Sequence, residues 1–324
     1  MTTRPTTRPW PRHAVVLGAA GLVGSGVAEQ LVVTATCESV ELVDPRRNVA
    51  RSHVVDLAEA QVLAGDATTT VTEVAADDAR PADLVVVAAS LPETPDGDRR
   101  DFLAGNLALL QALAPTVSRL AGSDGVVLVL SNPVDVLTEA LRRLNGLDPT
   151  RLLGYSLNDS VRFRAALGRE LGVHPGRVGG VVLGEHGAGQ VPLFSRVTLD
   201  DQPVTLDPEA QRRVRADVDG WFERWSRLRP GRSSGWTTPV GTRRMVEAMA
   251  TGEVLPACVW TGGHPDLDDL DDCYLTLPAR LGPSGLAGTE LWALTPQETD
   301  GLRRAAASVA AAADEALDQA RRSA

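Results

Sequence analysis

The sequence contains neither lysine nor isoleucine, so arginine supplies all of its 32 basic residues. We interpret this bias as the codon usage of a GC-rich genome and not as a sign of function. Cysteine is also scarce, because Cys37, Cys258 and Cys273 are odd in number and form no CxxC pair. Neither a disulfide framework nor a zinc knuckle is therefore indicated, and we expect no metal site.

Long apolar runs are absent as well. No stretch approaches the ~20 apolar residues that span a bilayer. Residues 1–12 contain prolines, which are typical of a flexible arm, and lack the apolar core of a signal peptide. The formal net charge of −10 argues against nucleic acid or an anionic membrane as a partner. We therefore expect a cytoplasmic protein that acts on small molecules.

The 324 residues are sufficient for two domains or one large one, with a composition typical of a globular chain. Up to residue 150, short runs rich in valine and leucine alternate with helix-like segments. Such runs indicate strands buried on both faces of a parallel sheet. We expect an α/β fold with a doubly wound (Rossmann) domain over residues 13–150. Its strands are expected near 13–18, 39–44, 69–74, 83–90 and 124–133.

The pattern changes in residues 151–324, for which we expect an α+β domain. Residues 207–228 have the spacing of one long helix, and residues 253–261 and 272–281 that of two antiparallel strands. The last helix opens on Thr295, Pro296 and Glu298, the residues of a capping box. No linker separates the two parts, so we expect them to share an extensive interface.

A glycine-rich turn, "GAAGLVG", follows the first strand. Gly18, Gly21 and Gly24 would let the backbone, including Leu22 and Val23, approach a pyrophosphate at the start of a helix. Asp44 ends the second strand and is placed to bind a ribose diol and to repel the extra phosphate of NADP. The alternatives are a glycine turn without a ligand and, because Arg46 and Arg47 follow, NADP in place of NAD.

Three other motifs carry side chains suited to chemistry. Asn132, in "SNPVD", follows a buried strand, although an Asn-Pro turn needs no ligand. Asp159 and Arg162 lie three apart on a helix and share a face, as a surface ion pair also would. His186, in "GEHG", follows an apolar run and could enter a cleft or be structural. None of the three motifs is decisive alone.

Together the motifs resemble the lactate/malate dehydrogenase family in order and spacing. The resemblance rests on "GAAGLVG", Asp44, "DRRDFLAGN", "NPVDVLT", "DSVRFR", "GEHG…VPLFS", "SSGWTTP" and "TLPARLGPSGL". It implies an NAD-dependent enzyme that interconverts a 2-oxo acid and an L-2-hydroxy acid, assembled as a homodimer or homotetramer. Loss of the catalytic motifs would instead have favoured a non-catalytic NAD-binding regulatory protein.

The resemblance also implies residue roles. His186 and Asp159 would form a proton relay, and Arg162 would bind the substrate carboxylate. Asn132 would hydrogen-bond the reacting oxygen or the nicotinamide side of the pocket, and Ser234 would lie beside the substrate.

The charged segment before Asn106 would be a mobile lid. Arg99, seven residues before Asn106, would polarise the reacting carbonyl when the lid closes, with Arg100 beside it. Ala89 and Asn106, which flank the segment, would contact the cofactor. The alternative is that the lid arginine is only solvated.

Three positions depart from the family pattern. Glu93 stands where the family has arginine for oxaloacetate or glutamine for pyruvate, so it would repel a dicarboxylate unless it points outward. Ala188 and Gly189 replace the usual Asp and Ser or Thr, and Asn158 replaces leucine. These departures favour a non-standard substrate, with ordinary malate dehydrogenase as the alternative.

Overall fold

The computed structural model describes residues 10–65, 68–91, 99–229, 235–262, 270–290 and 292–323. The first half of the chain forms a parallel sheet. Its elements are β1 (His13–Leu17), α1 (Leu22–Val33), β2 (Ser39–Val43), α2 (Arg47–Ala64), β3 (Thr70–Glu73), β4 (Leu84–Val87), α3 (Arg99–Ala121), β5 (Val126–Val129), α4 (Val134–Asn145) and β6 (Leu152–Gly154). The strand order β3-β2-β1-β4-β5-β6 is that of a doubly wound α/β fold, as the sequence predicts.

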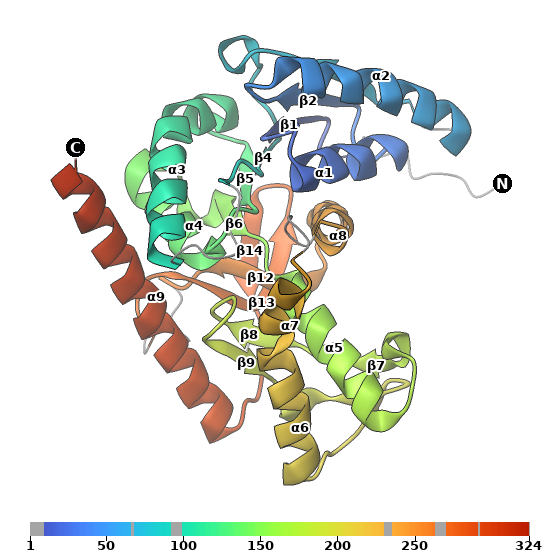
Figure 1. Ribbon diagram of the computed structural model, residues 1–324, viewed down its shortest axis with the longest axis vertical. Helices are drawn as coiled ribbons and strands as arrows, with labels where there is room; N and C mark the ends of the chain where they lie inside the picture. The colour runs from blue at the N-terminus through green and yellow to red at the C-terminus, as the bar shows by residue number, and fades with distance from the viewer. Residues whose placement is uncertain are drawn as a thin grey trace.

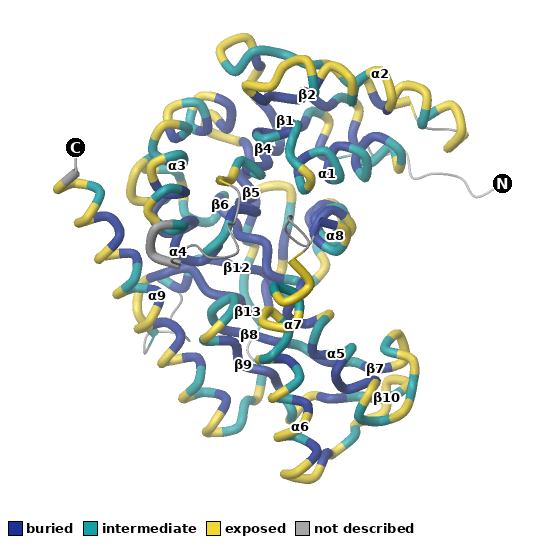
Figure 2. Tube along the Cα trace, viewed as in Figure 1, coloured by how far each residue is buried: buried dark blue, intermediate teal, exposed yellow. Residues whose placement is uncertain are grey.

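The buried strands explain why the valine-rich runs are continuous and not alternating. Every residue of β4 and β5 is buried. Figure 1 shows α1 and α2 to one side of these strands and α3 and α4 to the other, so both faces of the sheet are covered. In Figure 2 the buried segments follow the central strands, while the outer turns of α2 are exposed.

Most strands of the second half continue the same sheet. The elements of this half are α5 (Leu157–Leu171), β7 (Val178–Gly179), β8 (Val182–Gly184), β9 (Gln190–Pro192), β10 (Thr198–Leu199), β11 (Gln202–Pro203), α6 (Pro208–Asp219), α7 (Trp221–Arg227), α8 (Thr237–Thr251), β12 (Val254–Trp260), β13 (Tyr274–Gly282), β14 (Gly285–Thr289) and α9 (Pro296–Ser323). The exceptions are β7, β10 and β11, which form a separate three-stranded sheet. The predicted antiparallel pair is β12 with β13. Because β12 also pairs with β6, the sheet crosses the expected boundary at residue 150 without a break.

The single helix expected over residues 207–228 is wrong. The structure divides it into α6 and α7, with Gly220 between them. Glycine loses more backbone freedom in a helix than any other residue, which weakens the helix at this point. The Arg224 side chain donates across the break to the Asp217 carbonyl oxygen at 2.7 Å, and this bond holds the turn.

The capping box at the start of α9 is confirmed. The Thr295 N–H donates to the Glu298 carboxylate at 2.9 Å, and the Glu298 N–H donates back to the Thr295 hydroxyl at 3.3 Å. From this start α9 packs along α3 and α4 of the first half and β8, β9 and β13 of the second (Figure 1). The C-terminal helix therefore joins the two halves. No helix in the described ranges is both long and apolar enough to cross a membrane.

Candidate active site

The glycine turn is set by close backbone contacts. Gly18 has φ +85°, and a Cβ there would lie 2.5 Å from the Ala89 nitrogen. A Cβ on Gly24 would lie 2.2 Å from the Gly18 carbonyl oxygen. Gly21 precedes α1 and forms no side-chain cap, so the first N–H groups of the helix remain available to an anion. This arrangement fits the pyrophosphate of a dinucleotide.

Asp44 ties the second strand to this turn. One carboxylate oxygen accepts the Ala20 N–H at 3.0 Å, and the other accepts the Arg46 N–H at 2.9 Å. The Arg46 guanidinium also donates to Asp44, at 3.2 Å. Arg47 is bound instead to Glu73, at 2.5 Å. Both arginines that follow Asp44 are thus paired with carboxylates.

Asn106 connects the carboxyl ends of two strands. Its amide nitrogen donates to the Asn132 carbonyl oxygen at 3.2 Å, and its amide oxygen accepts the Leu91 N–H at 2.8 Å. The Ser131 hydroxyl donates to the Ala89 carbonyl oxygen at 2.6 Å. The ends of β4 and β5, where a doubly wound sheet binds its ligand, are therefore held together by side chains.

His186 and Asp159 are in contact, as the resemblance implies. Nδ1 of His186, on the loop between β8 and β9, lies 2.7 Å from Oδ2 of Asp159, in the first turn of α5. The His186 side chain is 17% exposed and that of Asp159 6%. Burial lowers the pKa of His186, but the charge and hydrogen bond of Asp159 more than offset it, so the pKa is raised above its usual value.

Arg162 lies next to this pair. Its Nη1 donates to the second carboxylate oxygen of Asp159 at 3.4 Å, so Asp159 contacts both cationic partners. The guanidinium is stacked on the ring of Trp221, 3.5 Å from its centroid. Sequence reasoning missed Trp221, because its position at the start of α7 depends on the break at Gly220.

Asp135 is a second acid against the histidine loop. Its Oδ2 accepts the His186 N–H at 2.8 Å, and the side chain is buried. Burial raises the pKa of Asp135 to about 6, although His186 and the Cys258 thiol favour the charged form. The sequence places Asp135 in the "SNPVD" motif but gives no signal for this contact.

The Asn158 side chain binds two hydroxyl groups, those of Tyr155 and Thr238. Its amide oxygen accepts the Tyr155 hydroxyl at 2.8 Å, and its amide nitrogen donates to the Thr238 hydroxyl at 3.0 Å. Asn158 thus joins α5 to α8.

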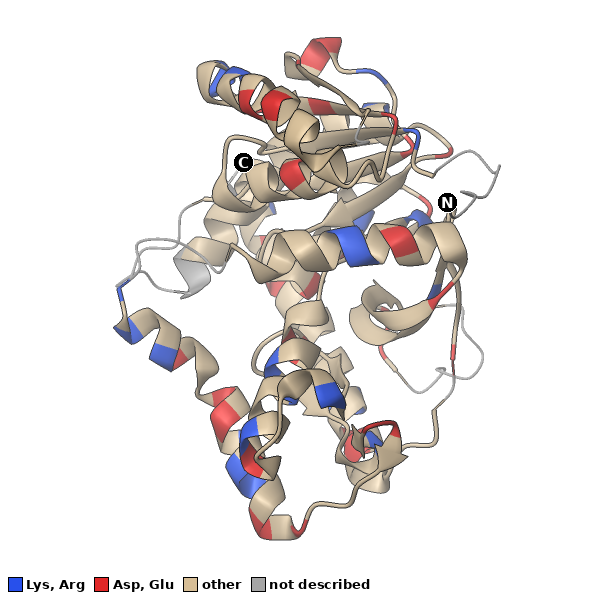
Figure 3. Ribbon diagram, turned by 90° about the vertical axis from the view of Figure 1, so that its right-hand side faces the viewer, with Lys and Arg blue, Asp and Glu red and all other residues tan. Residues whose placement is uncertain are grey.

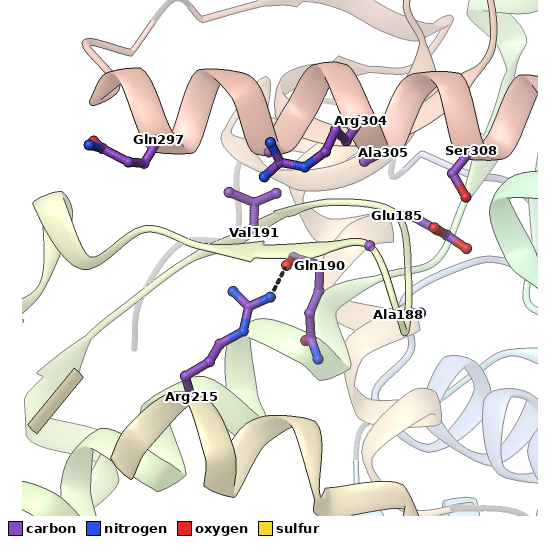
Figure 4. Close-up of a pocket in the computed structure, with 11 residues that line it drawn as sticks. Glu185, Ala188, Gln190, Val191, Arg215, Gln297, Arg304, Ala305 and Ser308 are labelled. Carbon is purple, nitrogen blue, oxygen red and sulfur yellow. Dashed lines mark hydrogen bonds between the residues drawn. The ribbon is translucent and has the colours of Figure 1, made fainter. Parts of the chain in front are cut away.

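Ala188 and Gly189 line a separate groove of about 360 Å³. Figure 4 shows this groove between the β8–β9 hairpin, Arg215 of α6 and Arg304 of α9. His186, Asp159 and Arg162 do not line it.

Four further predicted residues have side chains outside those that the structure describes. Glu93 and Ser234 lie outside the described residues, and Arg99 and Arg100 begin α3 with side chains that are not described. Across the described ranges, no group of three or more His, Cys, Asp or Glu side chains could hold a metal ion.

The fold and the site define a class: a dinucleotide-dependent oxidoreductase with a histidine–aspartate pair beside an arginine. The family model described as the NAD-binding domain of lactate/malate dehydrogenase matches residues 13–154. A malate dehydrogenase of Halobacterium salinarum is 30% identical over 305 residues, which cover 93% of this chain and 98% of the relative. An L-lactate dehydrogenase of Thermus aquaticus is 32% identical, with 88% and 94% covered.

The solved malate dehydrogenase of Aeropyrum pernix superposes with a TM-score of 0.84 at 25% identity, over 94% of this chain and 97% of that one. The chain belongs to the lactate/malate dehydrogenase family. It is an NAD-dependent oxidoreductase that acts on a CH–OH group.

Proposed function

We propose that this enzyme interconverts a 2-oxo acid and an L-2-hydroxy acid, with His186 as the proton donor and acceptor. The observation that carries the proposal is the 2.7 Å contact between His186 Nδ1 and Asp159, on the carboxylate that also contacts Arg162. One buried acid thus contacts both a proton donor and a fork for a carboxylate.

The geometry supports a specific proton path. Asp159 accepts from Nδ1, which directs Nε2 of His186 toward the substrate. NADH, when bound, would supply the hydride for the carbonyl carbon. As that C–H bond forms, the carbonyl oxygen takes the Nε2 proton and becomes the hydroxyl, and His186 is left neutral. In the oxidative direction His186 takes the same proton back.

Arg162 would hold the substrate carboxylate through the guanidinium edge that Asp159 does not occupy. Asn132 would bind the reacting oxygen or the nicotinamide, and Ser234 would lie beside the substrate. Arg99, at the start of α3, would polarise the carbonyl, with Arg100 adjacent. These assignments rest on the family resemblance.

The surroundings of Asp44 favour NAD over NADP. A 2′-phosphate needs a free cation, and both nearby candidates, Arg46 and Arg47, are paired with Asp44 and Glu73. The N–H groups of Leu22 and Val23 would hold the pyrophosphate, with Ala89 and Asn106 closing the site at the ends of the strands.

The substrate is the open part of this proposal. Relatives of similar identity are named malate dehydrogenase and L-lactate dehydrogenase, so the comparisons do not choose between them. We infer from Glu93 that a dicarboxylate is disfavoured, and that a neutral or cationic 2-oxo acid is preferred.

The test is NADH oxidation with oxaloacetate, pyruvate, longer neutral 2-oxo acids and acids that carry an amine or guanidine. We expect turnover of at least one, and a His186→Asn variant that binds NADH but is at least 100-fold slower. If oxaloacetate fails and Glu93→Arg restores it, Glu93 selects the substrate. If oxaloacetate is best, the enzyme is a malate dehydrogenase with Glu93 turned outward. If nothing turns over, a non-catalytic NAD-binding role replaces the proposal.

The enzyme is further proposed to be a cytoplasmic homo-oligomer. The helices α2, α1, α8 and α5 pack in succession. They carry exposed apolar side chains, including Val55, Val161 and Val240. Figure 3 shows this side of the molecule, where acidic and basic residues are interspersed with long uncharged stretches. An apolar face made of helices from both halves suits a second copy of the chain.

A further inference from the structure

The start of α7 lies over the substrate-binding arginine. The guanidinium carbon of Arg162 is 3.5 Å from the centroid of the Trp221 ring, which is a close cation–π contact. The Arg162 side chain is 21% exposed, so most of the guanidinium is already covered. The indole covers one face of the guanidinium, and the hydrogen bond to Asp159 occupies part of its edge.

The indole is itself held in place. Trp225, one turn further along α7, stacks on Trp221 with 5.5 Å between ring centroids and 12° between ring planes. Asp217, at the end of α6, accepts from Arg169 of α5 at 2.8 Å and from Arg224 of α7 at 2.5 Å. Through Asp217, α6 is bonded to α5 and α7 is bonded to α6. Helix α5 is the helix that carries Arg162.

We propose that Trp221 is a positioning residue for substrate binding: it fixes the plane of the Arg162 guanidinium so that a 2-oxo acid carboxylate can bind only at its free edge. The inference rests on the proposed role of Arg162. A planar fork binds a carboxylate through two parallel hydrogen bonds only when it is held edge-on. Asp159 alone cannot hold it, because its single 3.4 Å contact leaves the guanidinium free to rotate.

Trp221 would also lie next to a carboxylate bound by Arg162, because its ring stacks on the guanidinium. A carboxylate at the free edge of Arg162 lies beside the indole rim, which is apolar. Trp221 therefore acts on carboxylate binding and not on proton transfer, since its ring stacks on Arg162 and the relay bond of His186 is to Asp159. Its loss is expected to appear in KM and to leave kcat nearly unchanged.

The test compares Trp221→Leu with Trp221→Phe in the full-length enzyme, using the best 2-oxo acid of the panel. We expect Trp221→Leu to raise the KM for the 2-oxo acid about tenfold, which corresponds to the upper range of a partly buried cation–π contact. We expect kcat to stay within about threefold of the wild-type value and the KM for NADH to be unchanged. Trp221→Phe keeps an aromatic face and is expected to recover most of the loss. Phe222→Leu is the matched control, because that neighbour is 59% exposed.

Direct binding separates this proposal from the proposed function. Oxamate, an unreactive 2-oxo acid analogue, is titrated against tryptophan emission in the presence of NADH. We expect the emission of the wild type to change saturably with oxamate. We expect the Kd for oxamate to be higher in Trp221→Leu than in the wild type. Equal KM and oxamate affinity in both enzymes would overturn the proposal, as would equal losses in Trp221→Leu and Trp221→Phe. If no 2-oxo acid is turned over, the proposed function fails, and the oxamate titration still decides the role of Trp221.

Discussion

Two buried carboxyl groups contact the same histidine and act on it differently. Asp159 faces the imidazole ring, so its charge raises the pKa of His186. Asp135 accepts from the backbone N–H of His186 and so fixes the loop. Its charge also raises the pKa of His186, but less than that of Asp159 does, and burial raises the pKa of Asp135 itself to about 6.

Asp159→Asn is expected to lower the pKa of His186. Reduction needs the protonated imidazole, so the raised pKa sustains reduction as the pH rises above ~6.5, the ordinary histidine value. The variant should lose this activity at lower pH than the wild type, and be slower by a factor of about 10² at pH above 7. The measurement is kcat/KM for reduction against pH. An unshifted profile would show that Asp159 does not set the protonation of His186.

Asp135→Asn is expected to stabilise the enzyme at neutral pH. A carboxyl pKa raised from 3.8 to about 6 means that the folded state holds its proton more tightly. Stability is therefore lost as the pH rises from about 4 to about 6, by up to about 3 kcal/mol. Asparagine can accept the same His186 N–H without a charge. Urea unfolding should show the variant to be more stable at pH 7.5, with a gap that narrows near pH 4; a less stable variant at pH 7.5 would contradict this account.

At the scale of elements, the sequence predicts what is local and misses what depends on distant contacts. Continuous valine runs identify β4 and β5, and a capping box marks the start of α9. The break at Gly220 is missed because apolar residues at near-helical spacing continue across it. The pairing of β6 with β12 is missed because it joins segments about a hundred residues apart. The relay pair comes from resemblance alone. Trp221 and Asp135 act through stacking and a buried backbone bond, which leave no periodic signal.

The glycine turn supplies a prediction for an element. Gly24→Ala would favour helix α1 by about 1 kcal/mol if the site were open. A Cβ there lies 2.2 Å from the Gly18 carbonyl oxygen, so α1 must move away from β1. We expect a net destabilisation of about 1–3 kcal/mol and NADH binding weakened about tenfold. Gly288→Ala is the control, because a Cβ there meets nothing within 4 Å. Equal NADH affinity in both variants would show that the turn does not cradle the cofactor.

At the scale of the whole molecule, one sheet and one helix connect the two halves. β12 pairs with β6 of the first half and β13 of the second, and α9 packs on elements of both. The relay residues lie on α5 and on the β8–β9 loop, while the glycine turn lies beyond β1. Since the sheet and α9 fix these segments relative to one another, the cofactor and the substrate residues are positioned by the same core.

The oligomeric state is the prediction that depends on this architecture. Val161 of α5 is 46% exposed and Val240 of α8 is 48% exposed, on the face that we propose is covered by a second chain. In light scattering, the wild type is expected at two or four times the chain mass of 34.2 kDa. Val161→Asp would bury an unpaired charge in that interface and should shift the population to single chains. Ala311→Asp, on the exposed side of α9, is the matched control, and it should leave the oligomeric state unchanged. A wild type that is a single chain at micromolar concentration would contradict the proposed assembly. An oligomer that is unchanged in Val161→Asp would show that the interface lies on another face.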